Sequence, residues 1–424
     1  MRKSQNEIRD APQPSNPETP ASGFEETVRT FRLPFYARVW TSNLIQFICF
    51  QVLFLAMQWL VTSLTPLRSA VGLVGFVQGG TIALASPAAG VVVDRHPKRN
   101  LIAVGRFGLA AVAMAVALLV LTDSIAYWQI LVVSVIGGLL ASVLSPATQT
   151  YIVDVAGRKR TQHAVALNAV GASFGSMGGG AIAGILVGSV GMVATYASAS
   201  LGVALAAIVV LTIPIAGHSQ RGSERTSALA DLREGFQYVR ARPPLLLALL
   251  ACGMAIFNGA ITPMRPIFAR HVLGVGPEEF GVMSAVHGVG TFVAAVTVTL
   301  FPPRRHMGLV IAGSMLAFAS GLLLYALAFS YTWVLGVELW LGFTGQLWNV
   351  AALTGFQLAV PEAMRGRVLS MVFTLAQLGF VGTLAVGALA DAVGDQLALG
   401  IFGAIPTVLL SVLLVFGWKT LRKM

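Results

Sequence analysis

The chain has 424 residues, of which 56% are hydrophobic and only 11% are charged, and its mean hydropathy is +0.79. That composition lies far from the average soluble domain, so it excludes most soluble enzyme classes and indicates a membrane protein. The formal net charge is +11. Topology and contact with anionic lipid explain this charge, so no nucleic-acid partner is expected.

Twelve apolar stretches follow one another along the chain, and the first of them contains no charged residue. A helix of about 20 apolar residues is long enough to cross the hydrocarbon core of a bilayer. We therefore expect an all-α polytopic membrane protein with twelve transmembrane helices. They are predicted at residues 39–64, 71–93, 101–121, 127–151, 163–187, 192–215, 245–268, 280–300, 307–329, 333–360, 368–389 and 397–418.

The cationic residues cluster in alternate gaps between these stretches. If the N-terminal segment is cytoplasmic, the cytoplasmic side holds all of the 28 lysines and arginines except Arg68, Arg265 and Arg270. An excess of Lys and Arg marks the cytoplasmic loops of membrane proteins. With an even number of spans, both termini are then expected in the cytoplasm of a cell (inner) membrane.

The longest polar interruption begins after the sixth stretch and divides the chain into two similar halves. Gly72 to Gly79 resembles Gly281 to Gly288, and Gly184 to Gly191 resembles Gly387 to Gly394. Two similar six-helix bundles are what alternating access to one central site requires. The predicted division is a disordered cytoplasmic tail at 1–31, a bundle at 32–217, a cytoplasmic linker at 218–243, a second bundle at 244–418 and a short tail at 419–424.

A charged loop after the second stretch carries a motif. Gly90-Val-Val-Val-Asp94-Arg95-His96-Pro97-Lys98-Arg99 resembles the signature loop of the major facilitator superfamily, at the position where that family has it. The resemblance extends over residues 32–418. It implies two pseudo-symmetric six-helix bundles, transport of a small-molecule substrate by alternating access, and a monomer.

The resemblance also implies a gate that closes the cytoplasmic side. Gly90 would let a neighbouring helix approach closely, and Asp94 would lie against the positive N-terminal end of the eleventh span. Asp154 is expected to pair with Arg95 or Arg99. The alternative is that these charges only anchor the topology. The predicted gate comprises Gly90, Asp94, Arg95, Lys98, Arg99, Asp154, Arg365 and Arg367.

Two further patterns point to export. Trp59-Leu-Val and Val360-Pro-Glu, with Arg365-Gly-Arg, look like the branch that holds the enterobactin exporter and macrolide efflux proteins. That branch implies efflux of a fairly large, partly apolar molecule. Glycines at 171, 180, 184 and 188 resemble the glycine ladder of the superfamily's antiporters, although Ile185 replaces its proline. Tight packing against the eighth span explains the same spacing.

Polar residues inside the spans are the candidates for a proton and substrate pathway, because an ionisable group there costs about 2.5 to 3.5 kcal/mol to insert. We expect Glu338 to carry the coupled proton, with His287 as the second titratable candidate; structural roles are the alternatives. Arg265 is expected to attract an anionic substrate or to lie at the outer surface. The predicted pathway comprises Glu338, His287, Gln346, Asn349, Gln51, Gln58, Gln78, Asn258 and Arg265.

Several motifs of other protein classes do not occur. No lysine follows a glycine, so there is no phosphate-binding G-K-[ST] loop, and no histidine is followed by a glutamate, so H-E-x-x-H is not found. We expect no enzyme, no cofactor and no metal site. Cys49 and Cys252 fall inside predicted spans, where a structural disulfide is not expected.

These patterns together predict a secondary transporter. The favoured function is proton-coupled efflux by an antiporter, of the multidrug-resistance type, for a drug, siderophore or secondary metabolite. Its partners would be the substrate, protons and membrane lipids. A proton symporter importing a nutrient such as an organic acid, and a lipid-flipping or sensor module, are the alternatives.

Overall fold

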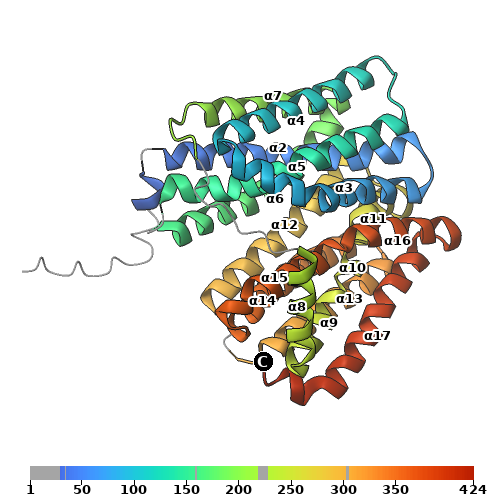
Figure 1. Cartoon of the computed structure of the whole chain (residues 1–424). Helices are drawn as coiled ribbons and strands as arrows, with labels where there is room; N and C mark the ends of the chain where they lie inside the picture. Colours follow the sequence, from blue (N-terminus) through green and yellow to red (C-terminus); the bar gives the residue numbers. More distant parts are fainter. Residues whose placement is uncertain (1–28, 34, 158–159, 218–227, 302–304) are drawn as a thin grey trace, which may run out of the picture.

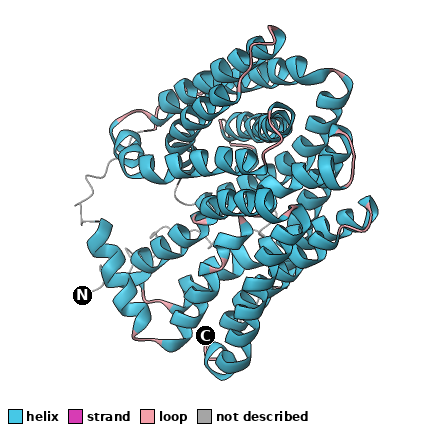
Figure 2. Ribbon diagram, turned by 90° about the vertical axis from the view of Figure 1, so that its right-hand side faces the viewer, coloured by secondary structure: helices cyan, strands magenta, loops and turns pink. Residues whose placement is uncertain are grey.

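The computed structural model describes residues 29–33, 35–157, 160–217, 228–301 and 305–424. In this part of the chain the regular structure is helical and no β-strand is found, which agrees with the predicted fold class (Figure 2). In lipid a helix satisfies its own backbone hydrogen bonds, so apolar stretches of this length fold as helices. Most of the predicted tail (1–28) and part of the predicted linker (218–227) lie outside the described residues.

The helices form two neighbouring groups (Figure 1). The first group comprises α2 (Tyr36–Leu64), α3 (Arg68–Arg95), α4 (Lys98–Leu121), α5 (Tyr127–Ala156), α6 (Thr161–Ser189) and α7 (Gly191–Leu211). The second comprises α9 (Pro243–Gly253), α10 (Ala255–Asn258), α11 (Ile261–Ile267), the π-helix η2 (Phe268–Val272), α12 (Pro277–Leu300), α13 (Met307–Leu327), α14 (Tyr331–Ala359), α15 (Glu362–Gln377), α16 (Gly379–Val393) and α17 (Asp395–Leu421).

Eleven helical segments in the described ranges are long and apolar enough to cross a membrane, so the chain is a multi-pass membrane protein. Helix α14, the predicted tenth span, is not one of the eleven although it has 29 residues. It carries Glu338, Gln346 and Asn349, which lower its hydropathy. The count of twelve spans therefore stays a prediction.

Two predicted spans are interrupted rather than continuous. The seventh consists of α9, α10, α11 and η2, and the eleventh consists of α15 and α16, which meet at Leu378. Pro263 and Pro266 lie within α11 and cannot donate backbone hydrogen bonds, and the π-turn follows directly. Prolines and π-turns are common causes of bends in helices, and π-turns recur at functional sites.

The two groups contact each other mainly through two antiparallel helix pairs, α3 with α16 and α6 with α12. At Gly184 and Gly281 the backbones of α6 and α12 approach so closely that an added Cβ would clash, which confirms the predicted packing role of the glycine ladder. Near the start of α3, the Asp391 carboxylate of α16 accepts hydrogen bonds from the backbone N–H groups of Arg68 (2.7 Å) and Ser69 (2.9 Å). The groups are therefore joined at the Arg68 end of α3.

The predicted linker contains a helix, α8 (Ala228–Arg240), that the sequence reading did not anticipate. Helix α8 packs against α15, where Glu234 forms an ion pair of 2.7 Å with Arg367. Gly235 lies against the backbone of Arg367. The segment between the two groups is thus partly ordered against the second group.

Candidate functional site

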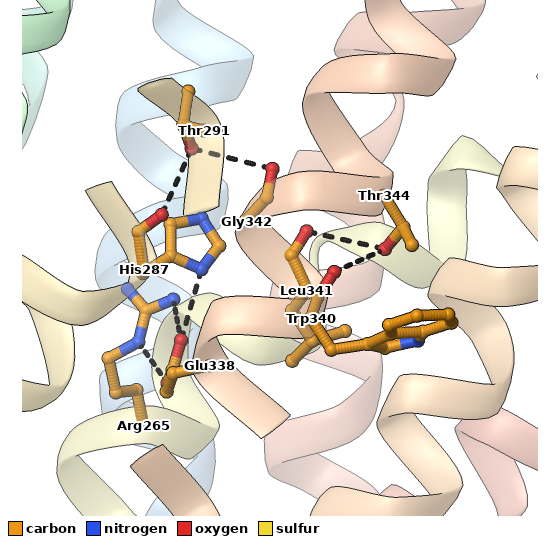
Figure 3. A network of polar contacts seen from close by, with 8 residues as sticks. All are labelled: Arg265, His287, Thr291, Glu338, Trp340, Leu341, Gly342 and Thr344. Atoms are coloured by element: carbon orange, nitrogen blue, oxygen red, sulfur yellow. Dashed lines mark hydrogen bonds and ion pairs between the residues drawn. The ribbon is translucent and has the colours of Figure 1, made fainter. Parts of the chain in front are cut away.

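A buried ionic cluster lies between α11, α12 and α14 (Figure 3). The guanidinium of Arg265 donates two hydrogen bonds to the carboxylate of Glu338, from Nε to Oε1 at 2.7 Å and from Nη2 to Oε2 at 3.0 Å. Nδ1 of His287 lies 3.0 Å from the same Oε2. One carboxylate is therefore held between a permanent cation and an imidazole that can gain or lose a proton.

Close helix packing brings these three side chains together. Gly342 of α14 lies so close to the backbone oxygen of His287 that no larger residue would fit, and Gly290 of α12 makes the same kind of approach to Leu339. Thr291 donates a hydrogen bond to the His287 oxygen at 3.2 Å (Figure 3). Arg265 reaches the cluster from α11, between the two prolines that bend the seventh span.

The side chains of the three cluster residues differ in how much of their surface is exposed. The Glu338 side chain is fully buried, that of Arg265 is 11% exposed, and that of His287 is 27% exposed. His287 is thus the most accessible of the three. Tyr325 interacts electrostatically with Glu338 and Arg265, but its buried hydroxyl makes no hydrogen bond of standard geometry.

The structure changes two expectations for this region. Arg265 neither lies free at the surface nor offers its charge to an anion, because Glu338 neutralises it. Gln346 is half-buried and Asn349 is exposed, whereas Glu338 is buried, and neither amide side chain lines the cavities described next. Gln346 and Asn349 therefore do not share the buried environment of Glu338.

A first cavity extends into the first helix group. Its described walls come from α2, α3, α4, α5 and α7, with α11 and α16 closing one side. Ala113 of α4 and Tyr196 of α7 form part of this wall. Of the glutamines predicted on the pathway, Gln58 and Gln78 line this cavity, whereas Gln51 does not and instead lies against Gly179 of α6.

A second cavity lies between the two groups and shares walls with the first. Gln78, Asn258 and Gln377 contribute amide groups to it, and Trp348 contributes an aromatic wall. Phe54, Gly75, Gln78, Thr262 and Thr383 line both cavities. His287 lines neither of these two cavities. Helix α11 connects cavity and cluster, because Thr262 precedes Arg265 by one helical turn.

The predicted cytoplasmic gate is not assembled. Asp154 pairs with Lys98 at 2.7 Å, rather than with Arg95 or Arg99. Asp94 is exposed and forms no ion pair among the described residues. A Cβ added at Gly90 would have no atom within 4 Å, so the close helix approach predicted there is not made in this structure. Arg365 is exposed, and Arg367 contacts Glu234.

Two polar networks were missed by sequence reasoning. At the Arg68 end, the Arg68 side chain donates to Asp395 at 3.0 Å beside the Asp391 cap. Within the first group, Arg106 is 1% exposed and bonds Ser42 and Asn43 of α2. The only available signal was the charge itself inside or beside an apolar stretch.

In the described ranges no group of three or more His, Cys, Asp or Glu side chains could hold a metal ion, and both cysteines are free.

Comparisons with known proteins agree with this architecture. The uncharacterized MFS-type transporter YfiS of Bacillus subtilis (strain 168) is 24% identical over 351 residues, which cover 78% of this chain and 81% of the relative. The enterobactin exporter EntS of Shigella boydii serotype 18 is 25% identical over 340 residues, covering 79% of this chain and 80% of the relative. The solved structure of the nucleoside transporter NupG superposes with a TM-score of 0.73 at 14% identity, covering 90% of this chain and 98% of the other.

The family itself follows from a match to a family model. The family model of the Major Facilitator Superfamily matches residues 39–383, which include the signature loop and the buried cluster. Members of this family are transporters rather than enzymes. The chain belongs to the Major Facilitator Superfamily.

Proposed function

We propose that this transporter exports a small amphiphilic compound in exchange for protons. The substrate would be a drug, siderophore or secondary metabolite. The observation that carries the proposal is the buried carboxylate of Glu338, which is held between Arg265 and the half-buried His287. An acid in that setting can be neutral or charged according to its protonation, and each state favours a different packing of the surrounding helices.

The coupling follows from the position of α11. When Glu338 is charged, its two hydrogen bonds hold Arg265 and therefore α11 against α14. A proton arriving through His287 removes the charge from the carboxylate and weakens that link. Thr262 on the same helix lines both cavities, so a shift of α11 changes the cavity walls. Proton binding and substrate binding thereby become linked.

The charge distribution and the contact between the two helix groups bear on the membrane and the direction of transport. The distribution of Lys and Arg favours cytoplasmic termini in a bacterial cytoplasmic membrane. The Arg68 end of α3, where the helix groups are joined, would then face outward, and the unassembled Asp94 gate would face the cytoplasm. That conformation admits substrate from the cytoplasm, as an exporter requires. The similarity to the enterobactin exporter EntS supports the same direction. We propose a monomer in contact with membrane lipids.

An importer of organic acids is less well supported. Such a substrate would need a cationic group in its cavity. None of the described residues that line the two cavities is Lys, Arg or His. The nearest candidate, Arg265, is already neutralised by Glu338.

The test is transport of the uncharged fluorescent amine N-phenyl-1-naphthylamine into everted membrane vesicles under an imposed pH gradient. We expect gradient-driven accumulation with the wild type and loss of accumulation with Glu338→Gln. The matched control, Glu362→Gln, alters an exposed acid at the start of α15 and should leave transport unchanged. Accumulation that ignores the gradient, or that survives Glu338→Gln, would remove the proton from Glu338. Dye movement out of the vesicles would reverse the direction of transport.

A further inference from the structure

The first cavity differs from a simple cleft between the two helix groups. It is lined by four residues of α4 (Leu109, Val112, Ala113 and Val116) and by Tyr196 of α7. Helices α4 and α7 pack against each other and against α2 and α5, and they lie on the side of the first group away from the second (Figure 1). The cavity therefore penetrates the first group and reaches helices that do not form the contact between the groups.

The chemistry of this cavity is strongly apolar. Its described walls are mostly aliphatic and aromatic side chains, and they include no Asp, Glu, Lys, Arg or His. A charged group would be costly to place there, because no opposite charge is available to neutralise it. An uncharged apolar group fits the walls.

Three polar atoms in the wall lack a hydrogen-bond partner among the described residues: Oε1 of Gln46, Oε1 of Gln58 and the hydroxyl of Tyr196, and the last two belong to the side chains that are most deeply buried. Gln58 is 7% exposed and Tyr196 is 2% exposed. Neither Oε1 of Gln58 nor the hydroxyl of Tyr196 has a hydrogen-bond partner among the described residues. Buried polar atoms are nearly always hydrogen-bonded, and an unpaired one is destabilising, so a ligand that supplies the missing bond is favoured.

The geometry points to a specificity subsite: the first cavity binds the uncharged, apolar end of the substrate, and Gln58 and Tyr196 select an end that carries a hydroxyl or amide hydrogen-bond donor. This assignment deepens the proposed export function and rests on it for its biological meaning. The five residues shared by the two cavities make them continuous. One molecule can therefore place a polar end near the amides of Asn258 and Gln377 and extend its apolar end to Tyr196.

The probe for this subsite is 2-naphthol, which is an uncharged aromatic with one hydroxyl donor. Naphthalene is the matched molecule without the donor, and 2-naphthoate is the matched anion. Binding is measured by equilibrium dialysis of the full chain in nanodiscs, and the partitioning into protein-free nanodiscs is subtracted. The measurement needs no transport.

The expected affinities follow from the wall chemistry. Gln58→Leu and Tyr196→Phe should each weaken 2-naphthol binding by about three- to tenfold, the effect of one neutral hydrogen bond. Both variants should leave naphthalene binding unchanged. 2-Naphthoate should bind at least about 100-fold more weakly than 2-naphthol to the wild type. Gln346→Leu is the control, because Gln346 is a half-buried glutamine that lines neither cavity.

A second variant tests the cavity itself. An added Cβ at Gly137 would meet only Nε2 of Gln78, at 3.7 Å, so Gly137→Leu can fold and place its side chain at the cavity wall. It should weaken 2-naphthol and naphthalene alike. Gly313→Leu is the control, since Gly313 has open space around it and lines neither cavity.

Three results would overturn the assignment: wild type that binds neither 2-naphthol nor naphthalene above the protein-free nanodiscs, equal loss of both probes in Gln58→Leu, or unchanged binding in Gly137→Leu. Failure of the subsite is separable from failure of the proposed export. Vesicle transport that persists without 2-naphthol binding removes only the subsite, and 2-naphthol binding without gradient-driven dye transport removes only the export.

Discussion

Arg106 in α4 and Arg265 in α11 are both buried, at 1% and 9% exposure, yet their partners differ in kind. Arg106 donates to neutral oxygens: Oγ of Ser42, Oδ1 of Asn43 at 2.7 Å and the backbone oxygen of Ala206 at 3.3 Å. Arg265 donates to the carboxylate of Glu338. The first network joins α2, α4 and α7 within one helix group, whereas the second joins α11 and α14 within the other.

Because of this difference, the hydrogen bonds of Arg106 should not depend on pH near neutrality, whereas the ion pair of Arg265 can. Hydroxyl, amide and backbone oxygens do not gain protons near neutral pH, so the Arg106 network keeps its bonds over that range. A carboxylate can be protonated, and its ion pair then loses its charge on one side. His287 lies beside that carboxylate, and no titratable partner occurs among the bonds described for Arg106. We therefore expect pH to act on the second group and not on the first.

The largest effect is expected from Arg265→Leu. It leaves the fully buried Glu338 without its cation, which should lower the free energy of unfolding by about 3 to 5 kcal/mol. The double variant Arg265→Leu with Glu338→Leu removes both charges and should be clearly more stable than the single variant. Thermal unfolding in detergent at pH 7 measures both. A double variant no more stable than Arg265→Leu would show that the pair does not act as a unit.

A smaller effect is expected from Arg106→Leu. This variant removes a cation without stranding an acid, and it leaves Oδ1 of Asn43 without its donor. The expected loss is about 1 to 3 kcal/mol in the same unfolding measurement. The pH dependence of dye transport should stay as in the wild type. A loss equal to that of Arg265→Leu, or a shifted pH profile, would break the contrast between the two networks.

His287→Gln should change transport more than stability. Glutamine can still hydrogen-bond Glu338 but cannot pass a proton in the way imidazole can. We expect gradient-driven transport to slow by about tenfold or more and its pH profile to change, because general acid–base groups contribute at least that much. The unfolding temperature should move little. His306→Gln, at a half-buried histidine next to α13 and outside the cluster, is the control and should leave the pH profile unchanged.

The smallest effect is expected from Asn168→Ala, which removes one neutral hydrogen bond of 2.9 Å to Asn43 at the edge of the Arg106 network. The free energy of unfolding should fall by about 0.5 to 1.5 kcal/mol. Transport should keep its dependence on pH. A pH profile altered by this variant would mean that the first network also takes part in proton coupling.

Much of the fold was readable from apolar runs alone. Long uncharged stretches form helices in lipid whatever their neighbours are, so the helix positions agree with the predicted spans to within a few residues at most ends. The breaks in the seventh and eleventh spans were not anticipated. Pro263 and Pro266 gave a signal for the first break. The break at Leu378 has no comparable signal, because no proline lies beside it.

The candidate site was readable only in part. Each of Glu338, His287 and Arg265 was identified as an ionisable group in an apolar helix, but the contact among their side chains was not predicted. They are separated by 73 and 51 positions along the chain, and glycine contacts between α12 and α14 bring them together. The burial of Arg106 was not predicted, because nothing in α4 reveals that Ser42 and Asn43 lie opposite it.

Sequence alone therefore determined the membrane class, the family and the positions of the helices, since these depend on composition and local order. Tertiary structure decided which buried charges are paired, that the gate at Asp94 is not assembled, and that a cavity reaches α4 and α7. The physical reason is that each helix forms independently in lipid, whereas the packing of helices against one another depends on the complementary shapes of their surfaces. Small residues such as Gly342 permit a close approach whose register no single helix encodes.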